Sequence, residues 1–236
     1  MAPARTGGQV PSTKASPRGA DDGHRLALVL GASAWLVQPL YVVAELVAAA
    51  RSSAPYSLLD QTISDLGATT CTSIDYPYGA VEVCSPLHAL VNGSFIVFGL
   101  LLAVGAVLLR RFLPRPRLAA ASTVAWVVAG LSSVATGFVP VDRDLDLHSV
   151  AALPSLFAMP IALLLLAGCL RRMAPGLGTA TAVVGLASLA GSVVFLVTAT
   201  SPELGGVWER LGFWPSYLWL PVVALVLLRR ARASRG

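Results

Sequence analysis

Residues 87–109 form the apolar stretch LHALVNGSFIVFGLLLAVGAVLL, and the basic run RRFLPRPR follows directly at 110–117. A helix needs roughly 20 predominantly apolar residues to cross a bilayer core of about 30 Å. The stretch has that length, and it contains no Lys, Arg, Asp or Glu. It therefore predicts a membrane-spanning helix rather than a strand or a helix of a soluble core.

The rest of the chain has the same character. Of its 236 residues, 56% are hydrophobic and 12% are charged, whereas a soluble domain is about a quarter charged. The mean hydropathy is +0.73, so the composition excludes a soluble globular protein. We predict an all-α polytopic membrane protein, a bundle of six transmembrane helices at 26–50, 87–109, 118–139, 149–170, 177–200 and 211–228. A disordered tail (1–25) precedes this domain (26–228), and a basic tail (229–236) follows it.

Basic side chains gather on one side of the predicted membrane. Residues 1–25, 110–117, 171–172 and 229–236 carry 14 of the 17, and the alternate loops carry the other three. Lys and Arg accumulate on the cytoplasmic side, so we expect a multi-pass protein with both termini cytoplasmic. Of the 17 basic residues 16 are Arg, a bias typical of GC-rich bacterial genes, so the expected membrane is a bacterial plasma (inner) membrane. The positive charge thus indicates orientation and gives no basic surface for nucleic acid. Membrane lipids are the expected partners, and the sequence indicates no particular protein partner.

The longest predicted external loop spans residues 51–86. Cys71 and Cys84 both lie in it and are candidates for a disulfide in an oxidising compartment. Ser57 is placed to cap a helix that Gly67 can end. We expect a short amphipathic helix in the membrane interface, with an apolar face of Leu59, Ile63 and Leu66 and a polar face of Asp60, Ser64 and Asp65.

One carboxylate lies inside a predicted span. Glu45 continues a polar stripe with Gln38 and Tyr41 at helical spacing. An ionisable group in a span is costly unless it is paired or hydrated, so the stripe should face the bundle interior. The alternative is that Glu45 extends to the nearby interface and has no partner in the bundle.

Two histidines start spans on the same side. His88 precedes Asn92 by one helical turn, and His148 follows an acidic segment that contains Asp142. Each could be a hydrogen-bonded anchor and no more. However, polar groups from several segments reach the same predicted depth, which indicates a cluster at the outer face. Its candidate members are Glu45, Ser64, Asp65, His88, Asn92, Asp142, His148, Glu209 and Arg210.

The order of short motifs resembles a known family. Tyr56-Ser57 is followed by ISDLG at 63–67, SPLH at 85–88, GFVP at 137–140 and Glu209-Arg210. This pattern, over about residues 26–228, resembles the bacterial membrane family catalogued as domain of unknown function nine-nine-eight. The ISD segment is more loosely similar to the Frag1/DRAM/Sfk1 membrane proteins. The resemblance implies a six-helix bundle and supplies no activity. Its matching positions are Ser64, Asp65, His88, Asn92, His148, Glu209 and Arg210.

Function is left open among several classes, and so is the question of whether the protein is an enzyme. The default without a reaction motif is a non-catalytic lipid-binding, sensing or scaffold role, with the polar cluster as a hydrogen-bond network. The alternative is an outer-leaflet metal-dependent hydrolase or lipid-modifying enzyme. In that case Arg210 would pair a phosphate or carboxylate, and a divalent metal such as zinc would be held by His88, His148, Asp65 and Asp142. A transporter or a haem protein with His88 and His148 as axial ligands is less favoured.

Overall fold

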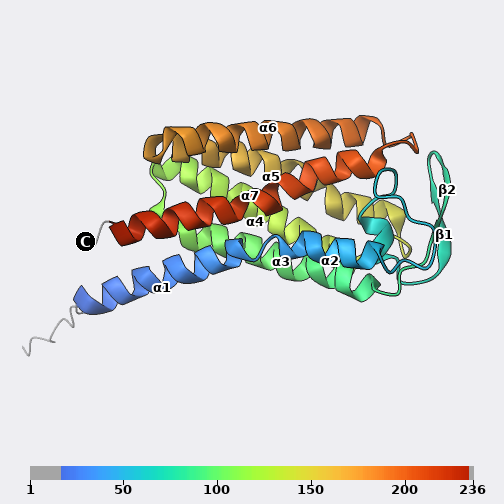
Figure 1. Cartoon of the computed structure of the whole chain (residues 1–236), viewed down its shortest axis with the longest axis horizontal. Coiled ribbons are helices and arrows are strands. Elements are labelled where there is room, and N and C mark those ends of the chain that lie inside the picture. The colour runs from blue at the N-terminus through green and yellow to red at the C-terminus, as the bar shows by residue number, and fades with distance from the viewer. Residues whose placement is uncertain (1–16, 234–236) are drawn as a thin grey trace, which may run out of the picture.

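The fold is an all-α bundle of membrane-length helices. A computed structural model describes residues 17–233, and within that range six helical segments are long and apolar enough to cross a membrane. They run along one common axis (Figure 1). The α-helices are α1 (Pro17–Leu36), α2 (Leu40–Ala49), α3 (His88–Leu109), α4 (Pro116–Phe138), α5 (Leu145–Met173), α6 (Pro175–Val197) and α7 (Gly205–Ala233).

The predicted first span is two helices. Pro39 has no N–H to donate and interrupts the helix between α1 and α2. Gln38 is fully buried at this break, and its Nε2 donates to the carbonyl oxygens of Ala34 (3.1 Å) and Phe98 (3.3 Å). The side chain thus holds the broken segment against α3. Helix α1 also begins at Pro17, inside the tail predicted to be disordered, while residues 1–16 lie outside the described range.

The helices close into a ring. Helices α3 to α7 each contact the next along the chain, and α1 contacts both α3 and α7. The centre holds fully buried aromatic side chains, among which Tyr41 of α2 stacks on Tyr217 of α7 with ring centroids 4.1 Å apart. Small residues allow close approach elsewhere: a Cβ atom on Gly99 of α3 would lie 2.6 Å from the carbonyl oxygen of Gly130 of α4. Such contacts are typical of membrane helix pairs.

The two ends of the bundle differ. One end carries an antiparallel β-hairpin of β1 (Thr72–Tyr76) and β2 (Gly79–Val83) (Figure 1), which the sequence analysis did not predict. We call this the hairpin end. The opposite end, where α1 starts and α7 finishes, is here called the arginine end. It carries the 3₁₀ helix η2 (Arg110–Phe112) and also Arg171, Arg172, Arg229 and Arg230.

The amphipathic helix expected at 57–67 is wrong. Only a single 3₁₀ turn, η1 (Ser64–Gly67), forms there. Two local caps divide the segment: Ser57 Oγ donates to Asp60 Oδ2 (2.7 Å), and the backbone N–H of Thr62 donates to Asp65 Oδ2 (2.9 Å). Each cap begins its own turn, so no continuous helix develops. The η1 turn is buried among the helix ends instead of lying on the surface.

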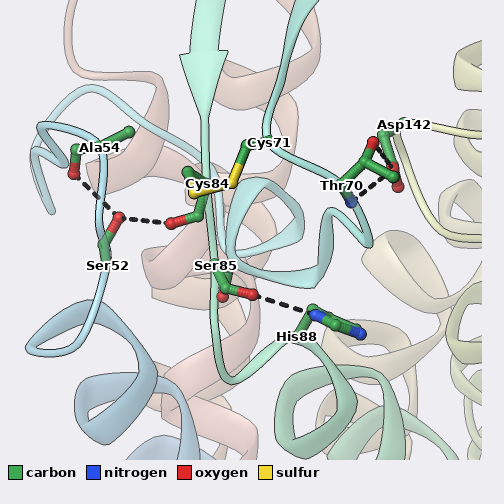
Figure 2. The surroundings of a disulfide bond; sticks show 8 residues. All are labelled: Ser52, Ala54, Thr70, Cys71, Cys84, Ser85, His88 and Asp142. Carbon is green, nitrogen blue, oxygen red and sulfur yellow. Dashed lines mark hydrogen bonds between the residues drawn. A yellow bond between two sulfur atoms is a disulfide. The ribbon is translucent and has the colours of Figure 1, made fainter.

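A disulfide joins the two ends of the hairpin segment. Cys71 and Cys84 form the pair suggested by the sequence, directly before β1 and after β2 (Figure 2). The third cysteine, Cys169, is free and buried in α5. The disulfide therefore closes the base of the hairpin, which follows η1 in the chain.

Candidate functional site

Arg210 is the centre of a buried network at the hairpin end. Its Nε donates to Glu45 Oε1 (2.8 Å), and its NH2 group donates to the Tyr56 hydroxyl (2.6 Å). The NH1 group donates to three carbonyl oxygens at 2.8–2.9 Å, those of Leu58, Gln61 and Gly206. All three guanidinium nitrogens are thus occupied by this chain. The hydrolase hypothesis required Arg210 to pair with a phosphate or carboxylate of a ligand. Its guanidinium group instead binds Glu45, Tyr56 and the loop.

Glu45 is the counter-ion of Arg210. The carboxylate is 1% exposed, and its second oxygen accepts from Trp214 Nε1 (2.8 Å). It therefore does not extend to the surface. Tyr56 completes the network, because its hydroxyl donates to the Thr62 carbonyl oxygen (2.7 Å) while accepting from Arg210. Burial raises the pKa of Tyr56 well above its ordinary value, so the phenol stays neutral. The network joins the loop to α2 and α7.

Asp65 fixes the η1 turn to the hairpin. Its carboxylate is 2% exposed and accepts from Thr62 N and from the Tyr76 hydroxyl of β1 (2.6 Å). Burial raises the pKa of Asp65, and the two hydrogen bonds oppose that rise. On the other side of η1, Asn92 Nδ2 of α3 donates to the Gly67 carbonyl oxygen (2.8 Å). Both predicted candidates thus hold the turn in place.

Ser64 and His148 contact each other beside that turn. Ser64 Oγ lies 2.8 Å from His148 Nε2, and His148 Nδ1 lies 2.5 Å from the Val139 carbonyl oxygen. A carbonyl oxygen can only accept, so Nδ1 carries a proton. In the neutral ring Nε2 is then the acceptor for the Ser64 hydroxyl proton. Both side chains are buried, with 8% of Ser64 and 5% of His148 exposed.

The Ser64–His148 pair lines a cavity of about 310 Å³. The cavity lies between the first turns of α5, the end of α6, the start of α7 and the hairpin turn. Its polar wall includes Thr62, Ser64, Tyr76, His148 and Glu209, and its apolar wall includes Leu153, Leu156, Phe195, Leu196 and Phe213. Glu209 also accepts from the Ile63 backbone N–H at 2.6 Å. Within residues 17–233, no Lys or Arg side chain lines this cavity.

Two candidates lie outside this arrangement. Asp142 accepts hydrogen bonds from Thr69 and Thr70 at 2.9–3.1 Å, and His88 Nδ1 lies 3.0 Å from the Ser85 carbonyl oxygen (Figure 2). Partial burial alone would raise the pKa of Asp142, but the hydrogen bonds outweigh it and lower the pKa. Both residues are thus anchors of the surface loops and do not line the cavity.

The predicted metal ligands do not form one site. Asp65 is bound by the hairpin, and both ring nitrogens of His148 are hydrogen-bonded, while His88 and Asp142 are engaged elsewhere. In the part of the chain that the structure describes, no group of three or more His, Cys, Asp or Glu side chains could hold a metal ion. The same two bonds to His148 leave no free ring nitrogen for a haem iron.

A family comparison covers almost all of this architecture. The family model described as "Protein of unknown function (DUF998)" matches residues 35–226. The chain belongs to the DUF998 family. No curated protein and no solved structure matches it. The DUF998 match runs from the end of α1 into α7, so it includes the Arg210 network, the Ser64–His148 pair and the cavity.

Several contributors to this DUF998 site were missed from the sequence. Tyr76 and Phe213 line the cavity, and Trp214 binds Glu45. The alternating segment TSIDY at 72–76 and the turn residues after it were the available signal for a hairpin that would place Tyr76. Phe213 and Trp214 gave no such signal, because aromatic residues near the end of a spanning helix are typical of the membrane interface whatever they contact.

Proposed function

We propose that this DUF998 protein binds an amphiphilic lipid of the surrounding bilayer in the cavity between α5, α6 and α7. The observation that carries the proposal is the division of one cavity into a polar wall at the hairpin end and an apolar wall on membrane-length helices. An amphiphile has the same division. The volume of about 310 Å³ lies at the lower end of the range for small-molecule sites.

The lining also favours a type of head group. Glu209 and Asp146 line the cavity together with hydroxyl groups and His148. An anionic head group would meet carboxyl side chains there and no cationic partner, since the donors of Arg210 are turned to Glu45 and the loop. We therefore propose a neutral or cationic head group, bound by hydrogen bonds to the polar wall.

The proposed orientation follows the arginines. With the arginine end in the cytoplasm, both termini are cytoplasmic, and the cavity lies in the outer leaflet of the plasma membrane. Labelling of single introduced cysteines tests this. Glu203→Cys at the hairpin end should react with an impermeant maleimide on intact cells, and Gly176→Cys at the arginine end should not. The reverse labelling pattern would overturn the orientation.

A photoactivatable diacylglycerol in phosphatidylcholine nanodiscs tests lipid binding. We expect it to crosslink to α5 and α6 residues of the full chain, and we expect Ala152→Trp, which fills the cavity, to abolish the crosslink. Val150→Trp is the matched control, because this side chain on the same helix is 68% exposed and lies outside the cavity. Equal crosslinking of both variants, or none in the unmodified protein, would overturn the proposal.

A further inference from the structure

We propose that Ser64 and His148 form a nucleophile–base pair that cleaves a carboxylic ester of the lipid bound in the cavity. This inference rests on the proposed lipid binding and adds a reaction to it. It starts from three observations on one pair of side chains. The hydroxyl and the imidazole are at hydrogen-bonding distance, both are buried, and both line the cavity that the apolar wall continues.

The ring of His148 is held in the form that a general base requires. The Val139 carbonyl oxygen accepts from Nδ1, so the lone pair of Nε2 is directed at the Ser64 hydroxyl. A serine becomes an effective nucleophile when an adjacent base takes its proton and a third group orients that base. In better-known triads the third group is a carboxylate. Here the backbone carbonyl at the end of α4 has the orienting position.

Ser64 is also held on both sides along the chain. The N–H of Ile63, the residue before it, donates to Glu209, and the carboxylate of Asp65, the residue after it, accepts from Tyr76. The bonds come from α7 and from β1, so the η1 turn cannot rotate without breaking contacts with two separate elements. Glu209 and Asp65 are therefore positioning residues for the serine, and the hydroxyl keeps its direction toward the imidazole.

The reaction balances with water as the only co-reactant. Ser64 Oγ forms a bond to the ester carbonyl carbon as its proton moves to His148 Nε2. The bond from that carbon to the alkoxy oxygen then breaks, and the Nε2 proton passes to the leaving alcohol. Water attacks the resulting acyl-serine, gives one proton to Nε2, and the carbon–Oγ bond breaks with return of that proton to Ser64. The products are a fatty acid and an alcohol, with no change of oxidation state.

The cavity can hold such an ester with its carbonyl group at the polar wall and its acyl chain along the apolar wall. Ser64 and His148 lie at its polar wall, and the acyl chain would extend along Leu153, Leu156 and Phe195. The absence of Lys and Arg from the lining, within the described chain, favours an uncharged ester over an anionic phospholipid. We therefore assign a neutral long-chain acyl ester as the substrate class.

Two readouts test the chemistry on the full chain in phosphatidylcholine nanodiscs. A long-chain fluorophosphonate should form a covalent adduct, which peptide mass spectrometry should locate at Ser64. Hydrolysis of 4-methylumbelliferyl oleate should fall about 10²–10⁴-fold in Ser64→Ala and in His148→Asn. The asparagine amide still donates to the Val139 carbonyl oxygen and lacks the base, so His148→Asn is expected to fold.

Matched controls come from the same chain. Ser73→Ala changes an exposed serine of the hairpin, and His88→Asn makes the same exchange at a histidine that does not line the cavity. Both should hydrolyse the ester at the rate of the unmodified protein. Hydrolysis that survives in Ser64→Ala, or an adduct at another residue, would overturn the assignment.

The crosslinking lipid separates this inference from the proposed function. If the diacylglycerol crosslinks normally but neither adduct nor hydrolysis is found, the catalytic inference fails and lipid binding stands. If no lipid crosslinks to the cavity, the proposed function fails, and the inference that rests on it fails too. Normal crosslinking in Ser64→Ala and His148→Asn, with loss of hydrolysis, supports both.

Discussion

Replacing Arg210 with methionine should destabilise the protein strongly. The substitution removes five hydrogen bonds and leaves the Glu45 carboxylate buried beside Trp214 without its cation. Breaking a buried ion pair by removing one partner costs about 3–5 kcal/mol, because an uncompensated charge stays buried. We expect Arg210→Met to lie in that range.

A double-mutant cycle with Glu45→Met measures the interaction free energy between Glu45 and Arg210. Glu45→Met alone leaves a buried guanidinium without its counter-ion, so it should also cost about 3–5 kcal/mol. The double variant has neither charge. Its remaining cost is that of the loop carbonyls and the Tyr56 hydroxyl that lose their donor, and of the Trp214 indole N–H that loses its acceptor. Each such group costs about 1–3 kcal/mol. Arg210→Met loses the same donors and also keeps an unpaired buried carboxylate, so the double variant should be more stable than Arg210→Met and less destabilised than the sum of the two single variants.

Equilibrium unfolding in mixed micelles, followed by circular dichroism, measures these free energies. The assay should be run for the unmodified chain and the three variants under the same detergent conditions, since only the differences are compared. A cost below about 1 kcal/mol for Arg210→Met, or a double variant as unstable as the sum of the single variants, would refute the view that one buried ion pair joins α2 to α7.

Three further predictions concern other parts of the fold. Gly99→Ala should lose about 1–3 kcal/mol in the same unfolding assay, because the added Cβ meets a neighbouring backbone, whereas Gly93→Ala, with open space around it, should not lose stability by overpacking. The lowered pKa of Asp142 implies a stabilisation that is complete above its ordinary value of 3.8 and lost as the pH falls through the folded-state pKa; the difference in melting temperature between the unmodified chain and Asp142→Asn should therefore shrink in acid, and a pH-independent difference would contradict this. Removing the Cys71–Cys84 disulfide with Cys71→Ser and Cys84→Ser should cost up to about 3 kcal/mol in the chain-entropy picture, with faster amide exchange in the hairpin as a second readout.

The helices were predictable because their cause is local. An apolar stretch of membrane length has few alternatives to a spanning helix, since its backbone groups must be satisfied within the segment. The same reasoning did not give the helix ends. Helix α7 starts at Gly205, six residues before the predicted span, and so includes Glu209 and Arg210. Glu209 and Arg210 are buried in α7 and bonded to other elements. A prediction from hydropathy alone assigns charged residues to a loop, so it started the span after them.

The sequence predicted how far along the bundle axis the candidate side chains lie, but not which way each side chain points around the bundle. Counting residues to the next arginine pair placed His88 and His148 at one level, and Asp65 and Asp142 were expected at about the same depth. All four lie at the hairpin end. Their position around the bundle depends on which helices are neighbours and how each is rotated. His148 therefore meets Ser64, while His88 contacts Ser85 and Asp142 contacts the loop before the hairpin. Spacing in one sequence contains no information on that rotation.

Two adjacent residues of α7 hold different parts of the site, one beside the cavity and one in the loop network. Glu209 and Arg210 point about 100° apart around the helix, so one holds Ile63 at the cavity while the other holds the loop carbonyls and Glu45. If Arg210 acts only through the stability of the fold, ester hydrolysis should follow stability through the double-mutant cycle and recover in the double variant relative to Arg210→Met. His148→Asn should lose hydrolysis while costing no more than about 1–3 kcal/mol, the cost of a buried Ser64 hydroxyl without its acceptor. Hydrolysis that stays lost although the double variant is more stable than Arg210→Met would show that the guanidinium bonds to the loop, which the double variant also lacks, are needed to position Ser64.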